Sequence, residues 1–268
     1  MKILQFLMFA LALSANVSNS RGQANDKSSI GQWSPNEWAW TSEKWTGDGQ
    51  PYLRMRQEID QLITNGQNPD TLALQYKALA SKDSSNSQSQ FRWGYAAYKT
   101  AAKPGALPSL KLDGVEFALR RAKEPRNYEY TRLHFLVVAR LTPYHQLKEL
   151  GTRLLRHNPK DDEVKFYLVS ILDPGLYNTE KQQALKLAQE LARSQPKRAS
   201  TYSLIGETYL KVWIKSKSQG DADKSIAAYQ QFLRLAPPNH QFRRQAQNWI
   251  KFLQKAKTGK RSTLSVSR

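Results

Sequence analysis

Tyr202-Ser-Leu-Ile-Gly206-Glu-Thr-Tyr209 is followed after ten residues by Gly220-Asp-Ala-Asp-Lys-Ser225-Ile-Ala-Ala-Tyr229-Gln-Gln-Phe232-Leu-Arg-Leu-Ala-Pro237. Both segments carry apolar residues at helical spacing, and Pro237 cannot continue a helix. They therefore predict two helices joined by a turn at Gly220. Gly206 lies in the middle of the first helix, where the missing side chain lets the partner helix approach closely.

Prolines that end helices recur along the chain at similar intervals. Pro125, Pro159, Pro196 and Pro237 are 34, 37 and 41 residues apart. A period of 34 residues is typical of a two-helix repeat. Insertions of three and seven residues between paired helices account for the longer intervals. The sequence thus predicts a series of similar helical pairs.

The segment from Tyr202 to Pro237 resembles the tetratricopeptide repeat. In order, it has an aromatic residue, an aliphatic-Gly pair, a Tyr, a turn Gly, a small residue, an aromatic and a terminal Pro. The unit ending at Pro196 lacks the Gly, and the unit ending at Pro159 has Phe135 in its place. The unit from Phe91 to Pro125 keeps Trp93-Gly94, but its second helix is out of register. Other families of helical-hairpin solenoids remain an alternative.

The resemblance covers about residues 86–240. It implies an all-α fold: a right-handed helical-hairpin solenoid of about four repeats, at 86–239, with a C-terminal capping helix. An N-terminal helical pair is expected at 52–85, where Asn68 can cap a helix that begins at Pro69. In the capping helix, at 240–257, an apolar stripe should cover the last repeat; it consists of Phe242, Ala246, Trp249, Ile250 and Leu253. The polar, basic tail at 258–268 is expected to be disordered.

The first twenty residues resemble a secretory signal peptide in layout. Lys2 precedes an apolar run from Ile3 to Leu13, and small polar residues follow. Eleven residues rise only about 16 Å as a helix, too little to span a membrane. Cleavage is expected after Ala15 or Ser20, which predicts a secreted or periplasmic protein without a transmembrane span. An uncleaved membrane anchor is the alternative.

The chain of 268 residues is strongly basic, with a net charge of +19 and no cysteine. Without cysteine it has no disulfide, thiolate metal site or cysteine nucleophile. From Arg21 onward it holds 40 bases and 22 acids, a balance that attracts polyanions. Behind a signal peptide we expect an acidic protein partner or an anionic envelope polymer such as peptidoglycan or another anionic glycan. Nucleic acid is expected only if the protein stays in the cytosol, and scattered charge that merely solvates the chain is the alternative.

Known catalytic motifs are missing from the sequence. The four histidines, at positions 134, 145, 157 and 240, have no zinc-binding spacing, and no phosphate-binding loop or Gly-x-Ser-x-Gly elbow occurs. The acids Asp161, Asp162 and Glu163 stand at the expected start of a helix, where carboxylates stabilise the N-terminus. We therefore expect no enzyme, no metal and no cofactor, although an enzyme whose site cannot be recognised remains a third hypothesis.

The resemblance also implies a ligand groove lined by the first helix of each pair. The corresponding positions in this sequence are Arg132, Leu136, Arg140, Phe166, Ser170, Ser203, Glu207 and Lys211. Relatives that hold a peptide C-terminal carboxylate use a Lys followed four residues later by Asn, and no such pair occurs at these positions. The resemblance therefore implies binding of a protein or peptide through a mixed apolar and basic groove, without recognition of a carboxyl end.

A tryptophan-rich segment precedes the helices. Between positions 21 and 51 it carries Trp33, Trp38, Trp40 and Trp45, four of the seven tryptophans in the chain. Each buries roughly 150–250 Å² when it docks. This docking segment is expected to fold back on the first helices as a lid, to bind a separate partner or sugar rings, or to lie at a membrane interface.

Overall fold

The computed structural model describes residues 50–101, 112, 114–122, 127–141, 147–174 and 178–257. Over these ranges the fold is all-α, as predicted, with eleven helices and no strand. None of the helices in these ranges is both long enough and apolar enough to cross a membrane. The helices are α2 (Gln50–Thr64), α3 (Pro69–Ala80), α4 (Ser87–Ala101), α6 (Val115–Ala122), α7 (Tyr128–Leu141), α8 (Leu147–His157), α9 (Asp162–Ile171), α10 (Asn178–Ser194), α11 (Ala199–Ser216), α12 (Gln219–Leu235) and α13 (Arg243–Lys257).

Helix ends fall where the sequence predicts them. Pro159, Pro196 and Pro237 each stand two residues after the last residue of a helix, respectively α8, α10 and α12. Asn68 caps α3, because its side chain accepts a hydrogen bond from the Asp70 amide at 3.0 Å, and Pro69 occupies the first turn. Pro125, the first proline of the series, lies outside the described residues.

The turn between α11 and α12 differs from the prediction. Gly220 lies inside the first turn of α12, and the chain reverses at Lys217 and Ser218. Lys217 caps the C-terminus of α11 in the left-handed conformation, with φ at 54°. Its ammonium group lies 4.8 Å from the ring centroid of Trp213, a cation–π contact that helps to hold this conformation. A lysine therefore takes the place in the turn that glycine usually takes.

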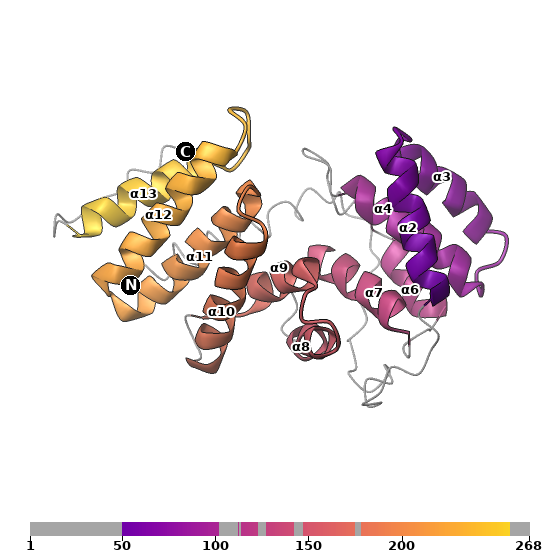
Figure 1. Ribbon diagram of the computed structural model, residues 1–268, viewed down its shortest axis with the longest axis horizontal. Helices are drawn as coiled ribbons and strands as arrows, with labels where there is room; N and C mark the ends of the chain where they lie inside the picture. The colour runs from indigo at the N-terminus through magenta and orange to yellow at the C-terminus, as the bar shows by residue number, and fades with distance from the viewer. Residues whose placement is uncertain are drawn as a thin grey trace, which may run out of the picture.

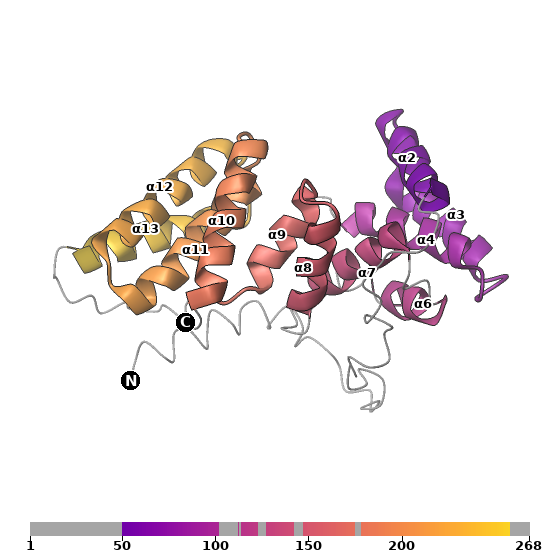
Figure 2. The same cartoon turned by 60° about the horizontal axis from the view of Figure 1, so that its bottom comes forward.

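The helices are arranged in a repeat-like series. Each helix from α6 to α13 packs against the next one along the chain, and α4, α7, α9 and α11 also pack against one another in sequence. These four helices form a continuous layer, here called the first-helix layer. The helices α6, α8, α10 and α12 pack on it (Figures 1 and 2). The molecule is elongated, with α2 to α4 at one end and α11 to α13 at the other.

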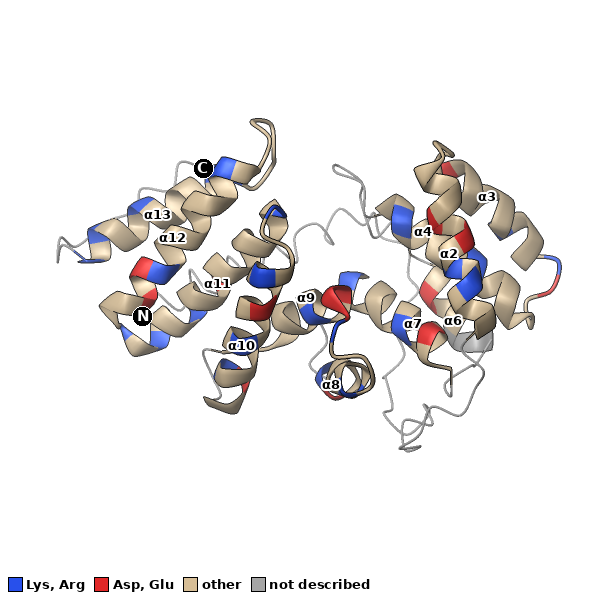
Figure 3. Ribbon diagram, in the orientation of Figure 1, with Lys and Arg blue, Asp and Glu red and all other residues tan. Residues whose placement is uncertain are grey.

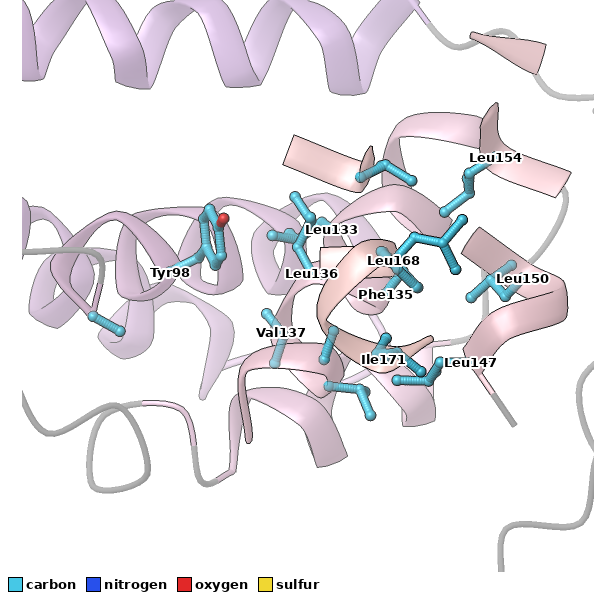
Figure 4. Packing of buried hydrophobic residues seen from close by; sticks show 14 of the residues in the cluster. Tyr98, Leu133, Phe135, Leu136, Val137, Leu147, Leu150, Leu154, Leu168 and Ile171 are labelled. Carbon is cyan, nitrogen blue, oxygen red and sulfur yellow. The ribbon is translucent and has the colours of Figure 1, made fainter. Parts of the chain in front are cut away.

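The hydrophobic core follows this layer. One cluster of buried residues extends from α2 to α11, and a second joins α11, α12 and α13. Figure 4 shows the middle of the first cluster, where Phe135 and Leu136 of α7 meet Leu168 of α9 and leucines of α8. Tyr52 of α2 also packs edge-on against Phe91 and Tyr130, so the N-terminal pair shares its core with α4 and α7.

The last helix, α13, covers α12 as a cap. Ala246, Ile250 and Leu253 are buried in the second cluster, and Trp249 is half-buried. Phe242 is 47% exposed, so it lies outside the apolar stripe that the sequence predicts. The reason is local, because α13 begins only at Arg243 and Phe242 belongs to the preceding turn. The segments at 1–49 and 258–268, which include the predicted signal peptide, the docking segment and the basic tail, lie outside the described residues.

Candidate binding surface

Three of the predicted groove residues form an exposed row on α11. Ser203, Glu207 and Lys211 are spaced by four residues, and each is at least partly exposed. The Lys211 ammonium lies 3.2 Å from the Glu207 carboxylate, so these two charges pair along the helix. The row alternates with buried residues such as Leu204 and Thr208, which keeps its side chains on the surface of the first-helix layer.

Two further predicted residues, Phe166 and Ser170, lie half-buried on α9. The Arg198 guanidinium, at the start of α11, lies over the Phe166 ring at 4.9 Å from its centroid. The ring of Tyr167 meets that of Phe166 edge-on at 5.5 Å, while the Ser170 hydroxyl donates to the Tyr167 carbonyl at 2.7 Å. The start of α11 and the face of α9 therefore carry a cationic and aromatic surface.

Arg140, at the end of α7, joins this surface through Tyr167. Its Nη1 donates to the Tyr167 hydroxyl at 2.8 Å, and its Nη2 donates to the Ala101 carbonyl at the end of α4. Within the described ranges Arg140 forms no ion pair with a carboxylate, and its Nε is buried without a hydrogen-bond partner. Among the described residues its charge is therefore balanced by a hydroxyl and by the negative end of a helix, which suits this group to an external anion.

The remaining two predicted residues are not accessible. Leu136 is 0% exposed and packs in the core, and Arg132 is 4% exposed. The prediction that these two side chains line an open groove is wrong, because α7 is the central helix and α2, α4, α8 and α9 all pack against it. The open part of the predicted set is therefore Arg140 with the residues of α9 and α11.

Arg132 lies instead at the centre of a buried ionic cluster. Its guanidinium donates to both oxygens of Asp161, at 3.1 Å for Oδ1, and to Glu163 at 2.6 Å. The Tyr128 hydroxyl also donates to Asp161, at 3.1 Å, and Asp161 caps α9 by accepting from the Val164 amide. The prediction that these acids stabilise a helix start is confirmed for Asp161. Its second role, pairing α9 with α7, has no signal in the sequence.

The contacts within this cluster stabilise the charged forms of Asp161 and Arg132. Burial alone would raise the pKa of Asp161, but the hydrogen bonds and the charge of Arg132 hold that pKa below its usual value. Burial would likewise lower the pKa of Arg132, and the two acids instead raise it. Nearby, Glu129 lies 3.3 Å from Arg56, yet burial dominates and raises the pKa of Glu129.

A second polar group, which sequence reasoning missed, lies between α2 and α4. The Tyr95 hydroxyl donates to both oxygens of Asp60, at 3.0 and 2.9 Å, and the Lys99 ammonium lies 2.7 Å from Oδ1 of the same carboxylate. Tyr95 and Lys99 are four residues apart on one helix face, so only the contact with Asp60 depends on tertiary structure. Through Tyr95 and Lys99, α4 therefore contributes polar contacts at the N-terminal end of the first-helix layer.

Metal-binding groups are not found in the described ranges, where no three His, Asp or Glu residues are placed to hold an ion. His134 is buried 3.6 Å from Glu116, and His157 and His240 pack against the rings of Tyr128 and Phe232. His145 and the four tryptophans of the docking segment lie outside the described residues. No protein-family model matches the chain, and no curated protein matches it significantly.

Proposed function

We propose that this chain is a non-catalytic scaffold of the tetratricopeptide kind, which binds a protein or peptide on its first-helix layer. The observation that carries the proposal is the contact series Arg140–Tyr167–Phe166–Arg198, at 2.8, 5.5 and 4.9 Å. It joins α7, α9 and α11 and combines half-buried rings with two guanidinium groups. Such a surface suits an extended segment with apolar and acidic side chains.

The tetratricopeptide assignment, a right-handed solenoid of about four repeats, rests on three supports. These are the proline interval, the alternation of layer helices with covering helices, and the close contact of α11 with α12 at Gly206. The proposal further places the protein outside the cytoplasmic membrane, because the first twenty residues have the layout of a signal peptide. Mass analysis of the mature N-terminus tests this part: a protein that begins at Asn16 or Arg21 supports export, and one that retains residues 1–20 in the cytosol contradicts it.

A site-specific cross-linking experiment tests the binding surface. A photo-reactive residue at Ser203, on the first-helix layer, is compared with one at the exposed Gln189 of α10. We expect a discrete cross-linked partner only from position 203, and its loss when Phe166→Ala and Arg198→Gln are combined. The matched control, Lys186→Gln with Arg193→Gln, removes two exposed bases from α10 and should leave the cross-link intact. Equal cross-linking from both positions, or no effect of the Phe166 and Arg198 variant, would contradict the proposal.

The charge distribution favours a second candidate function, binding of an anionic envelope polymer. Residues 199–257 hold ten bases and three acids, whereas residues 50–101 hold six bases and four acids. The C-terminal helices therefore carry more net positive charge than α2 to α4 do (Figure 3). A polyanion would be drawn to the C-terminal helices over about a Debye length, roughly 8–10 Å at moderate salt.

A further inference from the structure

Helix α13 carries five bases and no acid. Two of the bases have structural roles. Arg243 donates from Nη1 to the carbonyls of Leu233 and Ala236, at 2.6 and 2.7 Å, and so caps the C-terminus of α12. Lys257 pairs with Asp223 at the start of α12. These contacts anchor both ends of α13 to α12.

The other three bases form one row. At 100° per residue, Arg244, Lys251 and Lys255 project within about 40° of one another, and Asn248 projects beside them. All four are exposed, and the row lies opposite the buried Ala246, Ile250 and Leu253. The bases are separated by seven and four residues, which is about 10 and 6 Å along the helix axis. This set is called the cationic row.

The acids of α11 and α12 have printed partners outside the cationic row. Between 199 and 257 the acids are Glu207, Asp221 and Asp223. Glu207 pairs with Lys211, Asp223 pairs with Lys257, and Asp221 accepts from the Ser216 hydroxyl at 2.7 Å. Arg244 and Lys251 form no ion pair with any described residue. In Figure 3, α13 accordingly shows basic segments and no acidic one.

We propose that the cationic row binds a linear anionic polysaccharide that runs along α13. A straight row of cations over about 16 Å matches a chain with regularly spaced carboxylate or sulfate groups. Asn248 within the row, with Gln247 and Gln254 beside it, supplies amides that both donate to and accept from sugar hydroxyls. This inference rests on the second candidate function and gives it a site and a ligand class.

Two other polyanion surfaces fit less well. A helix that lies in an anionic membrane needs a free apolar face, and α13 buries its apolar face against α12. Single-stranded nucleic acid is held by rings on which bases stack, but Trp249 and Phe252 are half-buried and pack edge-on against each other at 5.8 Å. The chemistry of the row therefore favours a hydroxyl-rich polymer.

The test measures binding of the purified full chain to fluorescent polygalacturonate by anisotropy, over a range of salt. We expect log K to fall with log salt, with a slope of about −2 to −3. Arg244→Gln, Lys251→Gln and Lys255→Gln combined should weaken binding about 100-fold, at roughly five-fold per cation. The matched control, Lys82→Gln, Lys186→Gln and Arg193→Gln, removes the same charge elsewhere and should weaken binding less than about five-fold. Asn248→Ala should weaken binding to polygalacturonate but not to poly-glutamate, which has no hydroxyls.

Each contrary outcome identifies what fails. No binding to polygalacturonate at low salt overturns both the second candidate function and this site. Equal losses in the row variant and in the control overturn the site but leave polymer binding by diffuse charge. Tighter binding to single-stranded DNA or to anionic vesicles of matched charge than to polygalacturonate overturns the assignment of the ligand class. None of these outcomes bears on the peptide surface of α9 and α11, which is tested separately.

Discussion

Gly206 of α11 lies against the ring of Tyr229 of α12. A Cβ atom at position 206 would lie only 2.8 Å from Cδ1 and Cε1 of that ring, closer than carbon atoms pack in proteins. At the same contact the Ser225 hydroxyl, which is fully buried, donates to the Gly206 carbonyl at 2.8 Å. The missing side chain of Gly206 thus lets a ring and a hydroxyl of α12 reach the backbone of α11.

We expect Gly206→Ala to lower the free energy of unfolding by about 1–3 kcal/mol, because the added methyl group overpacks this contact. Chemical denaturation of the full chain measures the change. Gly220→Ala is the matched control, since a Cβ there meets only Ser218 Oγ, at 3.7 Å, within a helix. This control should be neutral or stabilising by up to about 1 kcal/mol. Equal effects of the two variants would show that Tyr229 does not restrict position 206.

In the pair formed by α7 and α8, the small and the large residue of this contact have exchanged helices relative to α11 and α12. Phe135 takes the position of Gly206 in the first helix, and Gly151 takes that of Tyr229 in the second, eight residues before the terminal proline. A Cβ at position 151 would lie 3.1 Å from Cε2 and Cζ of Phe135 and 3.1 Å from Cδ1 of Leu168. A ring and a glycine therefore meet between α7 and α8 as they do between α11 and α12, with the ring contributed by the opposite helix.

This exchange predicts coupling between positions 135 and 151. Gly151→Ala should destabilise the protein by about 1 kcal/mol or more, since the Phe135 ring must shift. In a Phe135→Leu background the same change should cost less, because the contact with the ring is removed and only the contact with Leu168 remains. A double-mutant cycle by denaturation measures the coupling. Additive effects of the two changes would contradict the contact.

Removing the charge of Arg132 should be costly. Arg132→Met leaves Asp161 buried without its main partner, and we expect a loss of about 3–5 kcal/mol in the free energy of unfolding. Arg92→Met is the control, because Arg92 pairs with Glu58 at 3.6 Å on the surface, and this loss should stay below about 1 kcal/mol. Asp161→Asn should lower the free energy of unfolding less in the Arg132→Met background than in the wild type. Losses of similar size in the two single variants would show that the buried cluster contributes no more than a surface pair.

The cluster also predicts how stability depends on pH. The pKa of Asp161 is lowered by Arg132 in the folded state, so the unfolded chain takes up a proton first as pH falls. The stabilisation by Asp161 is complete above the unfolded pKa of about 3.9 and is lost as pH falls through the lower folded pKa. The difference in unfolding free energy between wild type and Asp161→Asn should therefore shrink below about pH 4. A difference that stays constant from pH 7 to pH 3 would contradict this assignment.

Local signals in the sequence predicted most of the fold. Helix ends at Pro159, Pro196 and Pro237, the cap at Asn68 and the close approach at Gly206 all depend on neighbouring residues or on one helix pair. The binding surface was predicted only in part. Arg140, Phe166 and Ser203 lie on the surface of the first-helix layer, whereas Arg132 and Leu136 are buried. Helical spacing identifies a face of α7 but not which helices cover it.

By itself, then, the sequence determined that the described part of this protein is all-α, where α3 begins and where α8, α10 and α12 end, because proline geometry, capping and apolar periodicity act within a few residues. It also determined the strongly basic balance, which is a matter of composition. Only the tertiary structure decided which charged side chains have partners within the folded protein. Arg132 is neutralised by Asp161 and Glu163 from another helix, and Arg243 by carbonyls of α12, while Arg244 remains exposed on α13. Pairing of charges depends on distances between residues far apart in the chain, and these distances are set by helix packing.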